Sequence, residues 1–86
     1  MPYIREEKRM RHDGILESLK NFPAQDAGEL NYIMSVVAGE YLKAKGVNYQ
    51  TINDVVGALD GAKVEFQRRV VAPYEDKKIE ENGDVY

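Results

Sequence analysis

The chain has 86 residues, of which 43% are hydrophobic and 31% are charged, with a formal net charge of -3. This size and composition predict a single helical domain over residues 1–86. Because the sequence contains no cysteine, disulfides and thiolate metal sites are excluded. No apolar run is long enough to span a bilayer, and the charged N-terminus is unlike a secretory signal, so we expect a cytoplasmic protein with no membrane partner. The acidic balance argues against a nucleic-acid partner.

The N-terminal region carries a helical pattern that begins near Arg5. An apolar stripe follows it, made of Ile15, Leu16, Leu19 and Phe22. The pair Asp13-Gly14 interrupts the pattern, because glycine is unfavourable inside a helix. We therefore predict two short helices here, with Asp13 capping the second.

A long helix is predicted over residues 27–45. Its main apolar face consists of Leu30, Ile33, Met34, Val37, Tyr41 and Leu42. Gly46 follows as the residue with positive φ that commonly ends a helix. The other side carries Tyr32, Val36 and Ala38. A helix that is apolar nearly all round is either central in the monomer or placed at a subunit interface.

A second long helix is predicted over residues 51–72, with Thr51 or Asn53 as its N-cap and Pro73 closing or kinking its end. Its apolar positions recur at helical spacing: Ile52, Val55, Val56, Leu59, Ala62, Phe66 and Val70. The short connection over residues 47–50 predicts that the two long helices form an antiparallel hairpin. A short C-terminal helix is expected after Pro73, ending near Glu81. The predicted fold class is thus all-α.

Small residues lie one turn apart on the second long helix, at Gly57, Ala58, Gly61 and Ala62. They either accommodate bulky side chains of the preceding helix within one chain, which is the favoured interpretation, or allow a symmetric helix crossing between subunits. So small a chain without disulfides gains most from oligomerisation, and we expect a homo-oligomer.

Catalytic groups are sparse. His12 is the only histidine, and Ser18 and Ser35 lie outside any nucleophile motif. No spacing of His, Asp or Glu matches a metal site, and no glycine-rich phosphate loop is present. The sequence therefore predicts a protein that is not an enzyme, with no catalytic residue, metal or cofactor.

A basic and aromatic cluster lies around Pro73. Arg68, Arg69 and Lys77 could bind phosphate groups, and Tyr74 or Tyr49 could stack on a base. Glu65 precedes the two arginines at the spacing of helix-surface ion pairs, which is the favoured explanation for at least one of them. These five residues are the predicted ligand-binding set.

Three parts of the sequence form a recognisable pattern in chain order: GELNY at residues 28–32, Tyr49-Gln50 with Asn53-Asp54-Val55, and RRVVAPYEDKKIEENGDVY at residues 68–86. This pattern resembles a family of small uncharacterised proteins of phages and prophages. The resemblance covers roughly residues 28 to 86, and it implies a viral origin and the host cytoplasm rather than an activity.

Two functions remain open on the sequence. The first is an anti-defence sponge, an oligomer that sequesters a nucleotide signal of bacterial immunity through Arg68, Arg69, Lys77 and a tyrosine. That idea rests on an analogy of size and architecture with viral sponge proteins. The second is a structural or regulatory adaptor for a host or phage protein, with Ile79, Val85 and Tyr86 of the C-terminal region as docking residues.

Overall fold

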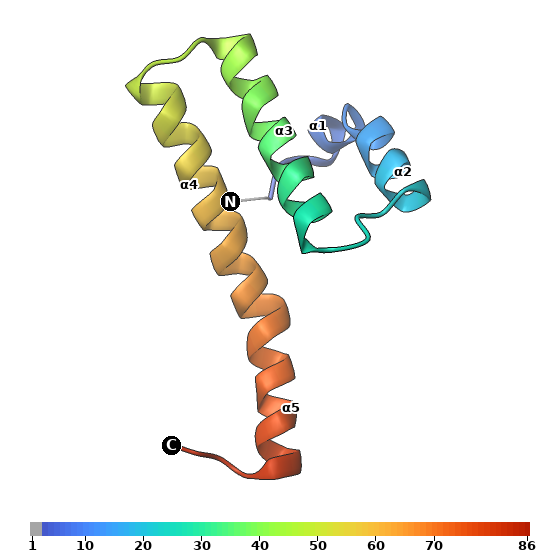
Figure 1. Cartoon of the computed structure of the whole chain (residues 1–86), viewed down its shortest axis with the longest axis vertical. Helices are drawn as coiled ribbons and strands as arrows, with labels where there is room; N and C mark the ends of the chain where they lie inside the picture. Colours follow the sequence, from blue (N-terminus) through green and yellow to red (C-terminus); the bar gives the residue numbers. More distant parts are fainter. Residues whose placement is uncertain (1–2) are drawn as a thin grey trace. The chain divides into compact units, whose positions relative to one another are not determined.

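The computed structural model describes residues 3–86, which form five α-helices and one π-helical segment, with no β-strand (Figure 1). The elements are α1 (Glu6–Met10), α2 (Asp13–Asn21), α3 (Ala27–Lys45), α4 (Tyr49–Phe66), the π-helical segment η1 (Gln67–Val71) and α5 (Ala72–Asn82). The predicted all-α fold is confirmed. The described residues fall into two compact units, residues 3–55 and residues 56–86. None of their helices is long and apolar enough to cross a membrane.

Two short helices, α1 and α2, form the N-terminal region, as the Asp13-Gly14 pair predicts. Asp13 does not cap the second helix, however. It is the first residue inside α2, and His12 occupies the capping position without a side-chain hydrogen bond. Asp13 instead places a negative charge in the first turn, where it is stabilised by the helix dipole.

Helix α3 has the predicted bounds because polar groups satisfy the backbone at both ends. The Asp26 side chain accepts a hydrogen bond from the Glu29 N–H at 2.8 Å, and Glu29 Oε1 accepts one from the Gln25 N–H at 3.2 Å. At the other end, Gly46 has a φ of 87° and its N–H donates to the Leu42 carbonyl at 2.7 Å. A side chain at this φ would be strained, so glycine suits the position.

Helix α4 begins at Tyr49, two residues earlier than predicted, because Asn48 is the residue that caps it. Asn48 Oδ1 accepts from the Thr51 N–H at 3.0 Å, and Thr51 Oγ1 accepts from the Asn48 N–H at 3.1 Å. This reciprocal pair is a capping box in which threonine takes the place of the usual glutamate. The prediction of Thr51 or Asn53 as the N-cap was therefore wrong, although Thr51 does take part in the cap.

The predicted hairpin is confirmed where α3 is joined to α4. The Tyr41 hydroxyl, near the end of α3, donates to Asp54 Oδ2 in α4 at 2.8 Å. The Gln50 side-chain amide donates to Asp54 Oδ1 at the same distance, 2.8 Å. The first of these bonds joins α3 to α4, whereas the second lies within α4 and holds the Asp54 carboxylate in place.

The Tyr41–Asp54 pair predicts a pH effect on stability. The hydrogen bond to Asp54 raises the pKa of Tyr41, with smaller contributions from desolvation and from the charge of Asp54. A group whose folded-state pKa is raised stabilises the fold below its unfolded pKa, here about 10, and loses that contribution as the pH rises through the folded value. We expect Tyr41→Phe to be less stable than wild type at neutral pH and equal to it well above the folded pKa. Urea denaturation at the two pH values measures this, and a pH-independent difference between the proteins would contradict it.

The described residues contain no buried hydrophobic side chain. The single buried residue among them is Thr51, which is 6% exposed and lies in the α3–α4 connection described above. At Gly57, an added Cβ would meet nothing within 4 Å. The structure thus shows no close approach that requires a glycine at this position.

Candidate functional site

The helix of the C-terminal unit continues past Pro73, so of the two predicted outcomes, a helix end or a kink, the helix end is wrong. Proline has no N–H, and in an α-helix its ring would clash with the carbonyl four residues earlier. The chain widens into η1 just before the proline, and the Ala72 N–H donates to the carbonyl of Gln67, five residues back. In this wider turn the backbone hydrogen bond runs to the carbonyl five residues back, where an α-helix would use the one four residues back. Helix α5 follows at once and closely matches the predicted C-terminal helix.

Arg68 lies in η1 and forms an ion pair with Glu65 of α4. Its Nε and one Nη donate to Glu65 Oε1 at 3.1 and 2.6 Å. The Glu65 side chain is only 14% exposed, whereas most of the Arg68 side chain faces solvent. The sequence-based alternative, a helix-surface pair with Glu65, is therefore confirmed for Arg68.

Tyr74 lies in the first turn of α5, and the Lys78 ammonium lies 5.5 Å from the centroid of its ring. This distance is within the range of a cation–π interaction. Lys78 also forms an ion pair with Glu81 at 3.1 Å. Sequence reasoning did not single out Lys78, although its position four residues after Tyr74 places both on one helix face.

The other predicted ligand-binding residues have different locations. Arg69 follows Arg68 in η1, and Lys77 lies in α5; both residues are exposed. Tyr49 is the first residue of α4 and belongs to the unit of residues 3–55. Arg68, Arg69, Tyr74 and Lys77 therefore lie on consecutive turns of one unit, and Tyr49 is not part of that unit.

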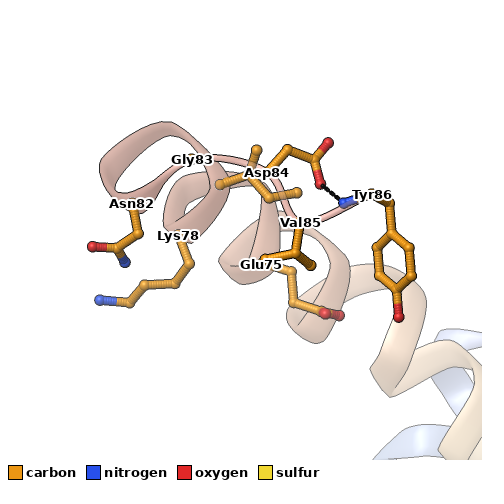
Figure 2. Close-up of a pocket in the computed structure, with 8 residues that line it drawn as sticks. Glu75, Lys78, Asn82, Gly83, Asp84, Val85 and Tyr86 are labelled. Atoms are coloured by element: carbon orange, nitrogen blue, oxygen red, sulfur yellow. Dashed lines mark hydrogen bonds between the residues drawn. The ribbon is translucent and has the colours of Figure 1, made fainter.

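A separate shallow hollow of about 310 Å³ lies at the end of α5 (Figure 2). Its lining includes Glu75, Lys78, Ile79 and Asn82 of α5 and Val85 and Tyr86 of the tail. Because residues from both segments line it, the tail turns back along α5 after Gly83, whose φ is 87°. The Tyr86 N–H donates to Asp84 Oδ1 at 3.0 Å, as the dashed line in Figure 2 marks. None of the five predicted ligand-binding residues lines this hollow.

The arrangement on η1 and α5 offers cationic groups and one aromatic ring, which can contact an anionic or aromatic partner. Three of these groups already have partners within the chain: Arg68 pairs with Glu65, the Tyr74 ring carries Lys78, and Arg69 also has an interaction within the chain. Binding an external ligand there means exchanging these contacts. Within residues 3–86, no group of three or more His, Asp or Glu side chains could hold a metal ion.

Comparisons with curated proteins and with solved structures gave no significant match. A family model matches residues 1–85, nearly the whole chain. It does not address the phage origin inferred from the C-terminal sequence, which stays a prediction. The chain therefore belongs to the family described as Domain of unknown function (DUF6899).

Proposed function

We propose that this chain is a small adaptor that acts by protein–protein contact and whose working form is a homo-oligomer. The observation that carries the proposal is the lack of any buried hydrophobic side chain in residues 3–86. Hydrophobic residues make up 43% of the sequence, so the apolar area left on the helices is large. Apolar surfaces of that extent mark sites of association.

Helix α3 is one of the helices with an exposed apolar face. Leu30, Met34, Val37 and Tyr41 recur along one face of this helix, and all four are exposed. Burying a side chain of this size contributes roughly 1.5–3 kcal/mol, which a chain of this length needs to offset the entropy of folding. Contact with further copies of the chain supplies that burial, and the remaining apolar surface is available to a host or phage protein.

The proposal predicts that stability depends on protein concentration. In an oligomer whose folding is coupled to assembly, the melting temperature rises as the protomer concentration rises. We expect such a rise when thermal unfolding is followed by circular dichroism across a hundredfold range of protein concentration. A melting temperature that is constant over that range would contradict the proposal.

The tail provides the surface for a second protein in this proposal. Ile79, Val85 and Tyr86 line the hollow at the end of α5, and all three are exposed. Deleting residues 82–86 is expected to abolish capture of a protein partner while leaving the helicity of the chain unchanged. Unchanged capture by the shortened chain would count against this role of the tail.

A second candidate function, for a protein of phage origin, is sequestration of a nucleotide immune signal. It is favoured by the placement of Arg68 and Arg69 in η1, within a few residues of Tyr74 and Lys77. π-Helical turns inside α-helices occur frequently at functional sites. In this mechanism Arg68 exchanges Glu65 for a phosphate, Arg69 and Lys77 add charge, and Tyr74 exchanges Lys78 for a base.

The sponge mechanism makes a quantitative prediction. A hydrogen bond to a charged group contributes about 1.5–3 kcal/mol, so Arg68→Ala and Arg69→Ala should each weaken nucleotide binding by roughly 10- to 100-fold. Calorimetric titration with a panel of linear and cyclic nucleotides measures this, with Lys43→Ala in the other unit as the control. If both arginine variants bind every nucleotide as the wild type does, this site assignment is wrong.

A further inference from the structure

Helix α4 carries an exposed apolar stripe in the part that belongs to the C-terminal unit. Val56, Leu59 and Phe66 are 54, 46 and 59% exposed, and Lys63 lies between the last two. Their successive spacings of three, four and three residues, as along a coiled-coil seam, place these residues on one side of the helix. Gly61 and Glu65 lie on the opposite side and are partly buried. The stripe is therefore the exposed side of α4 in this unit.

Lys63 is the one charged residue of this stripe. A lysine in such a seam selects among the ways in which two helices can pack, because its ammonium needs an anionic or aqueous environment. Asp60 lies beside the seam, one turn before Lys63. Within residues 3–86, neither Asp60 nor Lys63 has an ion-pair partner. Both charges are thus available to a partner.

We propose that the stripe of Val56, Leu59, Lys63 and Phe66 binds the same stripe of a second copy of this chain in antiparallel orientation, centred near Gly61. In this register Val56 faces Phe66 of the second copy, and Leu59 faces Lys63. The Lys63 stem covers apolar surface while its ammonium reaches Asp60 of the second copy. Two-fold symmetry makes this ion pair twice.

Charge complementarity favours this orientation over the alternative. A parallel, in-register pairing places Lys63 directly against Lys63 of the second copy, and like charges in a seam repel each other. The antiparallel pairing separates the two lysines and sets each beside an aspartate. The inference rests on the proposed self-association. It adds which surface the two copies share and that their α4 helices run antiparallel.

Disulfide crosslinking tests the orientation, and the absence of native cysteine leaves no background. A disulfide requires Cα atoms within about 7 Å. Val56→Cys and Phe66→Cys proteins, mixed in equal amounts and oxidised, should give a covalent dimer. Neither variant should crosslink alone, because its own cysteines lie about 15 Å apart along the axis in the antiparallel register. The matched control mixes Val56→Cys with Val64→Cys, at a similar level on another face of the helix, and should give no covalent dimer.

The outcomes separate the orientation from self-association itself. Crosslinking of Val56→Cys alone would mean a parallel pairing and would overturn the inference. An oligomer, measured under reducing conditions, that forms no covalent dimer in the mixture would also overturn it while leaving self-association intact. A monomer under all conditions would overturn both. If either variant loses helicity, the pair Leu59→Cys and Lys63→Cys repeats the test in the adjacent layer.

Discussion

Replacing Leu59 with aspartate is expected to weaken self-association by about 10- to 100-fold while α4 stays helical. Leu59 is exposed in the single chain, so its burial is gained on association rather than on folding. Because Leu59 is 46% exposed, each copy would lose about half of the roughly 1.5–3 kcal/mol that full burial of a leucine contributes, and a symmetric interface loses it twice. The new carboxylate faces Lys63 of the second copy, and this ion pair offsets little of the loss because both charges are desolvated in the seam. Sedimentation velocity measures the association, and circular dichroism measures the helicity.

Val64→Asp is the matched control for that variant. Val64 is also an exposed aliphatic residue of α4, but it lies outside the stripe of Val56, Leu59, Lys63 and Phe66. Both variants place the same poor helix former inside the helix, so the intrinsic helix penalty is similar. Val64→Asp should remain associated. Equal behaviour of the two variants would exclude the stripe as the contact surface.

Thr51→Val is expected to lower the free energy of unfolding by about 1–3 kcal/mol, although the substitution conserves side-chain shape. The hydroxyl accepts from the Asn48 N–H at 3.1 Å and donates to the Gly46 carbonyl at 2.7 Å. Without this hydroxyl, the Asn48 N–H and the Gly46 carbonyl lose their partner at the most buried position of the described chain. The same change removes half of the reciprocal cap of α4.

Urea denaturation at fixed protein concentration tests the role of Thr51. A lower denaturation midpoint with an unchanged slope of the free energy against urea concentration would show the expected loss of stability. Thr51→Ser is the control, since it keeps the hydroxyl and should retain most of the stability. A Thr51→Val protein as stable as the wild type would show that the connection between α3 and α4 does not depend on these hydrogen bonds.

The sequence was sufficient to predict α3 because both of its ends carry strong local signals. Gly46 has the positive φ that its position predicted, and Asp26 caps the other end through its side chain. The start of α4 was predicted less well, because Thr51 and Asn53, the caps expected from the sequence, are not the only residues of a suitable type near this end. Only the structure shows that Asn48 and Thr51 share the role.

Pro73 shows how a strong local rule can fail. Its missing N–H predicts a helix end, yet one π-helical turn before the proline lets the helix continue into α5. In the candidate site, the Glu65–Arg68 pair follows from sequence spacing, whereas the contact of Lys78 with Tyr74 was not predicted. Exposed charged side chains have several partners of similar energy, so spacing alone does not select one.

Sedimentation velocity of the wild-type chain tests self-association most directly. The monomer has a mass of 9.8 kDa. We predict a species of at least twice that mass at micromolar concentrations, shifting toward monomer on dilution. A monomer that stays folded and helical at every concentration would contradict the account, because its exposed helix faces would then need no partner.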